Sequence, residues 1–593
     1  MVREVHSRWT SLRELKIKSL HLSAPAVAIL GKRYLKKDAQ GQINESPEEM
    51  FWRVAKNIAE AERFYGNQNS PEELSEIFFR MMASLDFLPN SPCLMNAGRD
   101  LQQLAACFVL PIEDSLDSIF ETVKQTALIH QSGGGTGFSF SRLRPKDDAV
   151  QSTGGIASGP VSFMKVFNMA TEVIKQGGTR RGANMGVLRV DHPDIMEFIA
   201  IKKHLNEMEN FNLSVGITKS FMEALQKDDE YDLINPRTKQ PARHIKAKQV
   251  LEEIVSAAWE TGDPGILFLD RINEANPTPQ LGEIESTNPC GEVPLLAFEP
   301  CVLGSINLLN MLREKDGRWE VDFDNISMTV RHAVHFLDNV IDMNQYPLPQ
   351  ISQMAKGNRK IGLGVMGLAH FFIRLGVPYH SQKALEVIRG LMSFIQYQAR
   401  ERSMELAEKR GVFPNFKGSI YDKPEGIRLR NATLTTIAPT GTLSLLANCS
   451  SGIEPLFAIQ YTRRALEDME FQITDPLFTE FGEKKGFLNS ELIKSLSEGA
   501  SLQELPQVPR EVKELFITAF EIPPVSHIKI QAAFQDYTDN AVSKTINFPR
   551  DTTKEEVRET FLMAYQERCK GITIYRSGSK PSQVLACGTK QVC

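Results

Sequence analysis

Cysteine is scarce in this chain, and none of its cysteines is spaced like a ligand of a closed zinc site. The 593 residues include eight cysteines, with no CxxC pair among them. Scaffolds held together by disulfides are short and dense in cysteine, so that class of protein is excluded. We expect no structural metal site. Each cysteine has to be interpreted from its local sequence.

The chain also lacks an excess of positive charge and a long apolar run. Lys and Arg number 68 against 73 Asp and Glu, a net charge of −5, so a nucleic acid partner is not expected. The longest uncharged run, residues 431–453, is rich in Thr, Ser and Gly, whereas a membrane span needs about 20 mostly apolar residues. The first 16 residues carry charge throughout and contain no apolar signal segment. We therefore expect a cytoplasmic protein that does not bind membranes.

The composition is that of a globular protein, with 42% hydrophobic and 24% charged residues. Two helix starts of the same design, Ser46-Pro47 and Ser70-Pro71, each have Glu three residues after the Ser and predict a helical N-terminal region. From about residue 90, β-rich runs such as 301–308 alternate with helical patterns such as 326–341. This alternation predicts an α/β core.

The most informative segment is the pentapeptide NPCGE, which begins at Asn288. In an extended loop its alternate residues Asn288, Cys290 and Glu292 project from one side, so an amide, a thiol and a carboxylate would face one substrate. A Pro/Gly turn with a buried Cys and a solvated Glu is an equally good interpretation of five residues. Cys107 and Cys301 each lie in an apolar, strand-like run, where an inert core thiol is the more common role.

Four further segments have compositions that suit a ligand. Residues 90–98 and 438–444 contain hydroxyl groups and residues that allow tight turns. The second segment could hold a phosphate at a helix N-terminus, or simply cap a helix. The glycines of residues 133–138 allow close approach of a bulky ligand, although a flexible surface loop is the alternative. Residues 176–186 contain two adjacent arginines that suit phosphate or base contacts, or are solvated charge.

In their order along the chain, these segments resemble the catalytic subunit of ribonucleotide reductase, most closely its adenosylcobalamin-dependent class II. The resemblance spans nearly the whole chain. It is carried by LSAPAVAILGKRYL (22–35), NSPCLMNAG (90–98), GGGTGFSFSRLRP (133–145), GGIASGPVSFM (154–164), QGGTRRGANMG (176–186), FNLSVGIT (211–218), NPCGE (288–292), APTGTLS (438–444), QAAFQDYTDNAVSKTIN (531–547) and KGITIYRSGS (570–579).

The resemblance implies a ten-stranded α/β barrel with a central finger loop that carries NPCGE. It divides the chain into an N-terminal helical region (1–88), the barrel (89–576) and a mobile tail (577–593). An ATP-cone regulatory domain of about 90–100 residues has no room before Leu22, so overall ATP/dATP switching is not expected.

The resemblance also implies the chemistry of the site. Cys290 becomes the thiyl radical that takes the 3′ hydrogen of the ribose, Glu292 is the base on the 3′ hydroxyl, and Asn288 holds the ribose hydroxyls. Cys107 and Cys301 supply the protons and electrons that release the 2′ hydroxyl as water, and they end as a disulfide. The residues expected to bind the substrate are Ser91, Ala106, Pro439, Thr440, Gly441 and Thr442.

Cofactor, effector and reductant sites follow from the same resemblance. We expect dNTP effectors at a homodimer interface, a ribonucleoside diphosphate substrate, and a thioredoxin- or glutaredoxin-type reductant. The residues assigned to adenosylcobalamin are Gly133, Gly134, Gly135 and Thr136. Those assigned to the effector are Lys146, Gln176, Arg180 and Arg181, and the tail cysteines assigned to a redox relay are Cys587 and Cys593.

The class assignment depends on what is missing. None of the eleven tyrosines has a tyrosine neighbour, although class I subunits receive their radical through such a pair. The chain has no C-terminal glycyl-radical site and it keeps Glu292, unlike the anaerobic class. Two alternatives are a class I-type subunit that needs a separate radical-generating metal subunit, and a catalytically dead nucleotide-binding regulator. The second would be expected to have lost some of the catalytic residues.

Overall fold

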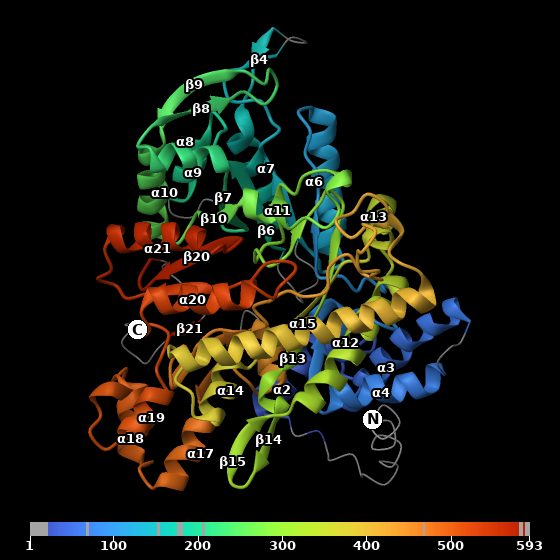
Figure 1. The fold of residues 1–593 in the computed structure, drawn as a ribbon, viewed down its shortest axis with the longest axis vertical. Helices are drawn as coiled ribbons and strands as arrows, with labels where there is room; N and C mark the ends of the chain where they lie inside the picture. Colours follow the sequence, from blue (N-terminus) through green and yellow to red (C-terminus); the bar gives the residue numbers. More distant parts are fainter. Residues whose placement is uncertain are drawn as a thin grey trace.

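The fold is described from a computed structural model of the chain (Figure 1). The structure describes residues 20, 22–66, 70–150, 154–174, 182–203, 208–465, 469–579 and 585–586. Five residues predicted to bind the effector or to form the relay therefore lie outside the described residues: Gln176, Arg180, Arg181, Cys587 and Cys593.

The N-terminal region is helical, as the two Ser-Pro helix starts predict. Its helices are α2 (Ala24–Ile29), the π-helix η2 (Leu30–Tyr34), α3 (Pro47–Ala59), the 3-10 helix η3 (Glu60–Tyr65) and α4 (Pro71–Ala83). Ser46 caps α3 by accepting from the Glu49 backbone N–H, and the Glu49 carboxylate accepts from the Ser46 N–H. Ser70 caps α4 by accepting from the Glu73 N–H, without the reciprocal bond from the Glu73 carboxylate.

A ten-stranded mixed sheet follows. Its strands are β1 (Phe87–Pro89), β2 (Cys107–Val109), β3 (Gly135–Ser139), β6 (Asn184–Arg189), β7 (Phe211–Ile217), β10 (Gly265–Phe268), β13 (Pro300–Asn307), β16 (Ile361–Met366), β19 (Thr545–Phe548) and β20 (Gly571–Arg576). Strands β2, β3, β6, β7 and β10 lie side by side in this order and are parallel to one another. At the two edges of this parallel group, β2 pairs with β13 and β10 pairs with β20, both antiparallel. We predicted that the helical region ends at residue 88 and the barrel begins at residue 89, and β1 spans both residues.

The sheet closes on itself through an extended segment, residues 433–437. Leu363 of β16 donates its N–H to the Leu434 carbonyl at 2.7 Å, and Ile437 donates to the Ala541 carbonyl at 3.2 Å. Residue 541 leads directly into β19, which is parallel to β20. The ring of strands is therefore complete, and the predicted α/β barrel is confirmed.

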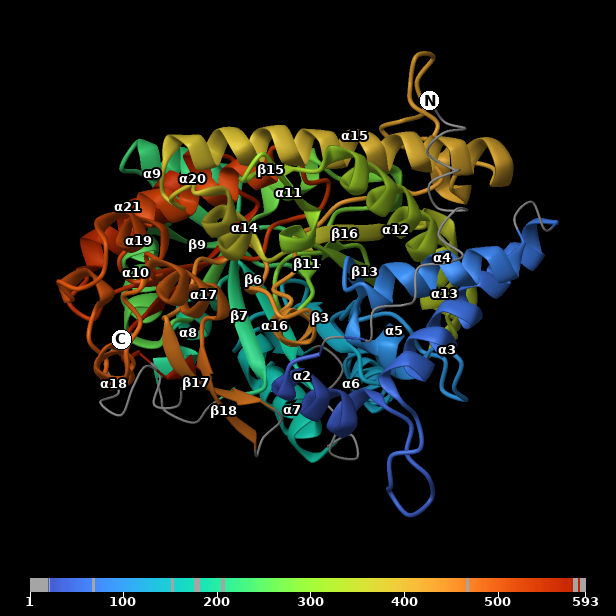
Figure 2. The same ribbon diagram turned by 90° about the horizontal axis from the view of Figure 1, so that it is seen from below.

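Helices surround the barrel, as expected where parallel strands are joined by crossovers (Figures 1 and 2). They are α5 (Ser91–Asn96), α6 (Leu116–Gln131), α7 (Gly159–Val173), α8 (Ile195–Ala200), α9 (Lys219–Gln226), α10 (Ala247–Thr261), α11 (Leu269–Glu274), α12 (Phe323–Met343), α13 (Pro349–Asn358), α14 (Leu368–Leu375), α15 (Gln382–Arg410), α16 (Gly441–Leu446), α20 (Pro524–Gln535) and α21 (Lys554–Gln566). The helix predicted over residues 326–341 is α12. The long α15 packs beside α12 and α20.

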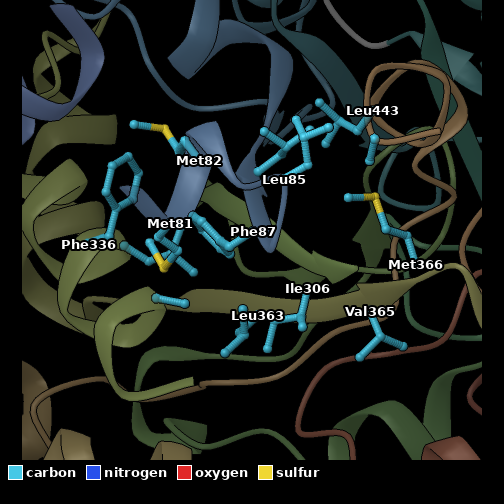
Figure 3. Packing of buried hydrophobic residues seen from close by; sticks show 14 of the residues in the cluster. Met81, Met82, Leu85, Phe87, Ile306, Phe336, Leu363, Val365, Met366 and Leu443 are labelled. Atoms are coloured by element: carbon cyan, nitrogen blue, oxygen red, sulfur yellow. The ribbon is translucent and has the colours of Figure 1, made fainter. Parts of the chain in front are cut away.

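The helical region and the barrel share one hydrophobic core (Figure 3). Met82 of α4 and Phe87 of β1 lie in the same cluster as Phe336 of α12, Ile306 of β13 and Leu363 of β16, and all five are fully buried. Burial of this size fixes the N-terminal helices against the barrel wall, so the two regions form one rigid support for the loops they carry.

A small lobe that the sequence analysis did not anticipate lies between the barrel segments. It consists of the hairpin β17 (Gln460–Ala465) and β18 (Met469–Thr474), followed by α17 (Pro476–Lys485), α18 (Ser490–Ser497) and α19 (Arg510–Leu515). The lobe has its own hydrophobic cluster around Phe478 and Phe516. Within the part of the chain that the structure describes, no helix is long and apolar enough to span a bilayer.

Candidate active site

The NPCGE segment forms the tip of a hairpin inside the barrel, which we call the finger loop (residues 286–295). Its strands β11 (Ser286–Thr287) and β12 (Pro294–Leu295) pair as Ser286↔Leu295 and Thr287↔Pro294. The tip is closed by the Asn288 N–H, which donates to the Val293 carbonyl at 3.3 Å. The finger loop lies so close to β3 that a Cβ on Gly137 would sit 1.8 Å from the Thr287 carbonyl oxygen. Only glycine fits there.

The three predicted residues of the loop have different environments. Cys290 is exposed, whereas Asn288 and Glu292 are buried, with 0% and 3% of their surfaces accessible. The Asn288 amide donates to the Glu292 carboxylate at 2.6 Å and its carbonyl oxygen accepts from the Val293 N–H at 3.0 Å. This arrangement is the reverse of a plain turn with a buried Cys and a solvated Glu. The accessible group is the thiol.

Cys107 and Cys301 meet behind the finger loop. They are register partners on the antiparallel strands β2 and β13, and both are buried. The Asn288 amide lies 3.7 Å from the Cys107 sulfur, which joins the pair to the loop. Burial, reinforced by the hydrogen bond to Cys107 and the nearby charge of Glu292, raises the pKa of the Cys301 thiol well above its ordinary value. Cys301 is therefore a protonated thiol at neutral pH.

A cavity of about 780 Å³ opens beside the thiol. Cys290 and Gly291 line it from the finger loop, and Asn212 lines it from β7. His370 and Glu454 also line it. The volume falls within the range of about 300–1,000 Å³ of small-molecule and cofactor sites.

Five of the six residues predicted to bind the substrate lie at the starts of two short helices, and the sixth is Ala106. Thr440 precedes α16 with a positive φ of 52°, and its hydroxyl accepts from the Gly452 N–H at 2.7 Å. Pro439 lines the cavity, Gly441 is the first residue of α16, and Ala106 is buried directly before Cys107. Ser91 is the first residue of α5. Backbone N–H groups at helix starts suit the binding of phosphate.

Two residues that the sequence analysis missed connect these helix starts. Arg33 donates to the Thr442 hydroxyl at 3.3 Å, and the Tyr34 hydroxyl lies 2.8 Å from the Ser91 hydroxyl. Both come from η2, within the segment LSAPAVAILGKRYL. The only signal for this role in the sequence was a cationic side chain next to a phenolic one near the end of that segment.

The glycine-rich segment, to which we assigned contacts with adenosylcobalamin, packs closely against neighbouring parts of the protein. A Cβ on Gly134 would lie 2.5 Å from the Phe108 ring, and one on Gly135 would lie 3.0 Å from the Pro289 ring. The Thr136 hydroxyl is buried between His130 and Asn184, at 3.0 and 2.6 Å. Residues 133–136 are not among those that line the cavity. Gly134 and Gly135 make room for protein packing, including the finger loop. The contact of residues 133–136 with adenosylcobalamin stays a prediction.

Lys146 is the one predicted effector residue that the structure describes. Its backbone N–H donates to the Asp194 carboxylate at 2.8 Å, and its ammonium lies 4.0 Å from Glu197. It therefore stands at the start of the loop that leads into α7. The effector assignment of Lys146 stays a prediction.

Comparison with known proteins identifies the family. The model for the ribonucleotide reductase barrel domain matches residues 105–575, and that for the ribonucleotide reductase all-alpha domain matches residues 20–102. A vitamin B12-dependent ribonucleoside-diphosphate reductase of Thermoplasma acidophilum is 48% identical, over 96% of this chain and 81% of the relative. One of Mycobacterium tuberculosis (strain CDC 1551 / Oshkosh) is 47% identical, with the same coverage.

A solved structure shares the fold. The class Id ribonucleotide reductase alpha subunit of Actinobacillus ureae superimposes with a TM-score of 0.77 at 24% identity, covering 94% of this chain and 97% of that one. The finger-loop geometry, the paired cysteines and both family models agree. This chain belongs to the ribonucleotide reductase family.

Proposed function

We propose that this chain is an adenosylcobalamin-dependent reductase that converts ribonucleoside diphosphates to 2′-deoxyribonucleoside diphosphates. The observation that carries the proposal is the placement of the thiols. Cys290 is exposed to the cavity, while Cys107 and Cys301 are paired and buried behind the same loop. The B12-dependent relatives at 47–48% identity support the cofactor and the diphosphate substrate.

Each of the five residues has a separate role in the proposed reaction. Cys290, as a thiyl radical, takes the 3′ hydrogen and returns it at the end of the cycle, while Glu292 accepts the proton of the 3′ hydroxyl. Asn288 orients the ribose hydroxyls and Glu292, to which it is already hydrogen-bonded. Cys107 and Cys301 together give two electrons and two protons. The 2′ hydroxyl leaves as water, and the two sulfurs form a disulfide.

The cavity suits a cofactor that brings its own metal ligands. His370 lines the cavity, but its Nε2 lies 2.7 Å from the Asp475 carboxylate and its Nδ1 accepts from the Ser450 N–H at 3.1 Å. Both ring nitrogens are engaged, so His370 does not offer a ligand to cobalt. Among the described residues, no group of three His, Cys, Asp or Glu could hold a metal ion either. Adenosylcobalamin, when bound, supplies the radical that activates Cys290.

A homodimer regulated by dNTPs is supported by an apolar surface on α6 and α7. Leu116 and Phe120 of α6 are 63% and 52% exposed, and Met169 and Val173 of α7 are 62% and 73% exposed. Exposed apolar groups on two adjacent helices favour contact with another protein surface. The loop that begins at Lys146 leads into α7, so an effector bound there would lie beside the second subunit.

The tail relay is supported by the strand β21 (Leu585–Ala586). It pairs with β17 through Thr462↔Ala586 and Arg463↔Leu585. Tyr461, the preceding residue of β17, lines the cavity that also exposes Cys290. A tail held at this edge suits delivery of electrons from a thioredoxin- or glutaredoxin-type protein, and a cytoplasmic location is consistent with such a reductant.

The test is anaerobic turnover of CDP and CTP with adenosylcobalamin, a small dithiol and each dNTP in turn. We expect dCDP to form without a second subunit or iron, with a rate that depends on the dNTP. A protein that is inert with adenosylcobalamin but active with a diiron or dimanganese partner would contradict the proposal and favour the class I alternative.

A further inference from the structure

The tip of the finger loop is held through two backbone carbonyl groups. The Pro289 carbonyl accepts from the side-chain amide of Asn212 at 2.8 Å. The Glu292 carbonyl accepts from the Ala541 N–H at 2.9 Å and from the Thr436 hydroxyl at 2.7 Å. Only Cys290 and Gly291 lie between these two anchors. The reactive thiol is therefore carried on a two-residue span.

The two anchors come from opposite halves of the barrel. Asn212 is on β7, within the parallel run from β2 to β10, whereas Thr436 and Ala541 belong to the segments that close the ring between β16 and β19. Gly291 has a φ of 80°, and a Cβ placed on it would meet nothing within 4 Å, so packing does not fix this residue. On the Pro289 side, the proline ring also lies close to Gly135, on which an added Cβ would be 3.0 Å from the ring.

We propose that Asn212 is a positioning residue for Cys290. Its amide fixes the plane of the peptide bond that joins Pro289 to Cys290, and so fixes the direction in which the thiol enters the cavity. One such hydrogen bond contributes only modestly to folding, whereas a shift of about 1 Å at a reacting atom costs a rate factor of about 10². The effect on rate therefore exceeds the effect on stability. For the reaction itself, the inference rests on the proposed reductase function.

Asn212 also lines the cavity, so direct contact with the substrate is the competing role. Steady-state kinetics distinguish positioning of the thiol from direct contact with the substrate. Loss of a substrate contact raises KM, whereas misdirection of the thiol lowers kcat and leaves KM close to its original value.

The experiment compares Asn212→Leu and Asn212→Asp with wild type. Leu removes the donor at similar volume, and Asp replaces the donor by a second acceptor. Asn325→Leu is the matched control, because the Asn325 amide likewise donates to a backbone carbonyl, that of Asn310 at 3.2 Å, and does not line the cavity. We expect kcat to fall by about 10- to 100-fold in both Asn212 variants, with KM within about twofold and a thermal midpoint lowered by at most a few degrees. The control should retain the wild-type kcat.

Hydrogen exchange of the finger loop supplies a readout that does not need turnover. The Gly291 N–H donates to the Asn288 carbonyl at 3.0 Å within the tip, and loss of the Asn212 anchor should make this amide exchange faster while the β3 amides stay protected. Unchanged exchange together with a wild-type kcat would overturn the inference, as would a raised KM with kcat intact. If the wild type shows no reductase activity, the proposed function fails, and the exchange experiment still decides whether Asn212 holds the loop.

Discussion

Cys107 and Cys301 lie directly opposite each other on the antiparallel strands β2 and β13, although they are far apart in the sequence. Opposed residues of such a pair have Cα atoms about 4.5–5.5 Å apart, which is within the range that a disulfide needs. The strands therefore hold the two thiols ready to be oxidised together, without movement of the backbone.

The raised pKa of Cys301 predicts selective labelling. With iodoacetamide at pH 8, we expect Cys290 to react first, since it is exposed, and Cys301 to stay unlabelled, since burial keeps its thiol protonated. Mass spectrometry of the peptides measures both. Protein unfolded in urea is the control, in which both sites should react. Equal rates at the two cysteines of the native protein would refute the assignment.

Cys290→Ser should have no turnover. Serine retains the shape of the side chain, but its O–H bond is too strong for the residue to act as the hydrogen carrier. In the presence of adenosylcobalamin and nucleotide, rapid-freeze EPR should show no radical formation. Normal radical formation in this variant would remove Cys290 from the role.

Glu292→Gln should bind nucleotide almost normally and lose a factor of about 10²–10⁴ in kcat, since the amide cannot accept a proton. The hydrogen bond from Asn288 to this side chain, 2.6 Å long in the wild type, can still form to the amide oxygen of Gln. Equilibrium binding and single-turnover kinetics separate the two effects. A variant with the wild-type rate would show that Glu292 is not the base.

Gly137→Ala should displace the finger loop. The added Cβ would lie 1.8 Å from the Thr287 carbonyl oxygen, so backbone has to move. Overpacking of this kind costs about 1–3 kcal/mol or more, and we expect a lower thermal midpoint and loss of activity. Gly390→Ala is the control, because Gly390 lies on an exposed face of α15 with nothing within 4 Å of the new Cβ. That substitution should leave stability unchanged or raise it by about 0.5–1 kcal/mol.

The double variant Cys587→Ser/Cys593→Ser tests the tail relay. With a thioredoxin-type protein as reductant, turnover should stop after about one cycle, because the active-site disulfide is no longer reduced by thiol exchange. A small dithiol that reaches Cys107 and Cys301 directly should preserve multiple turnover. Undiminished multiple turnover with the thioredoxin-type protein would show that these cysteines are not the relay.

The sequence by itself determined the features that depend on near neighbours. Ser46 and Glu49 form their reciprocal cap over three residues, so the start of α3 could be predicted from a few letters. The alternation of helical and extended patterns predicted an α/β core, and the ordered motifs predicted the family and, through it, the barrel. These signals are local, or are carried by whole segments, and need no knowledge of which strands pair.

Tertiary structure alone decided the environment of each group. From the sequence alone, Gly137 could make room for a ligand, form a turn or allow a close backbone contact. The structure shows that it allows a close backbone contact, because the Thr287 carbonyl lies next to it. NPCGE likewise does not show that Cys290 is exposed while Glu292 is buried. Pairing between distant strands sets the register, and register decides which side chains meet. For that reason, the contact of Cys107 with Cys301 and the anchoring of Pro289 by Asn212 became visible only once the barrel had closed around the finger loop.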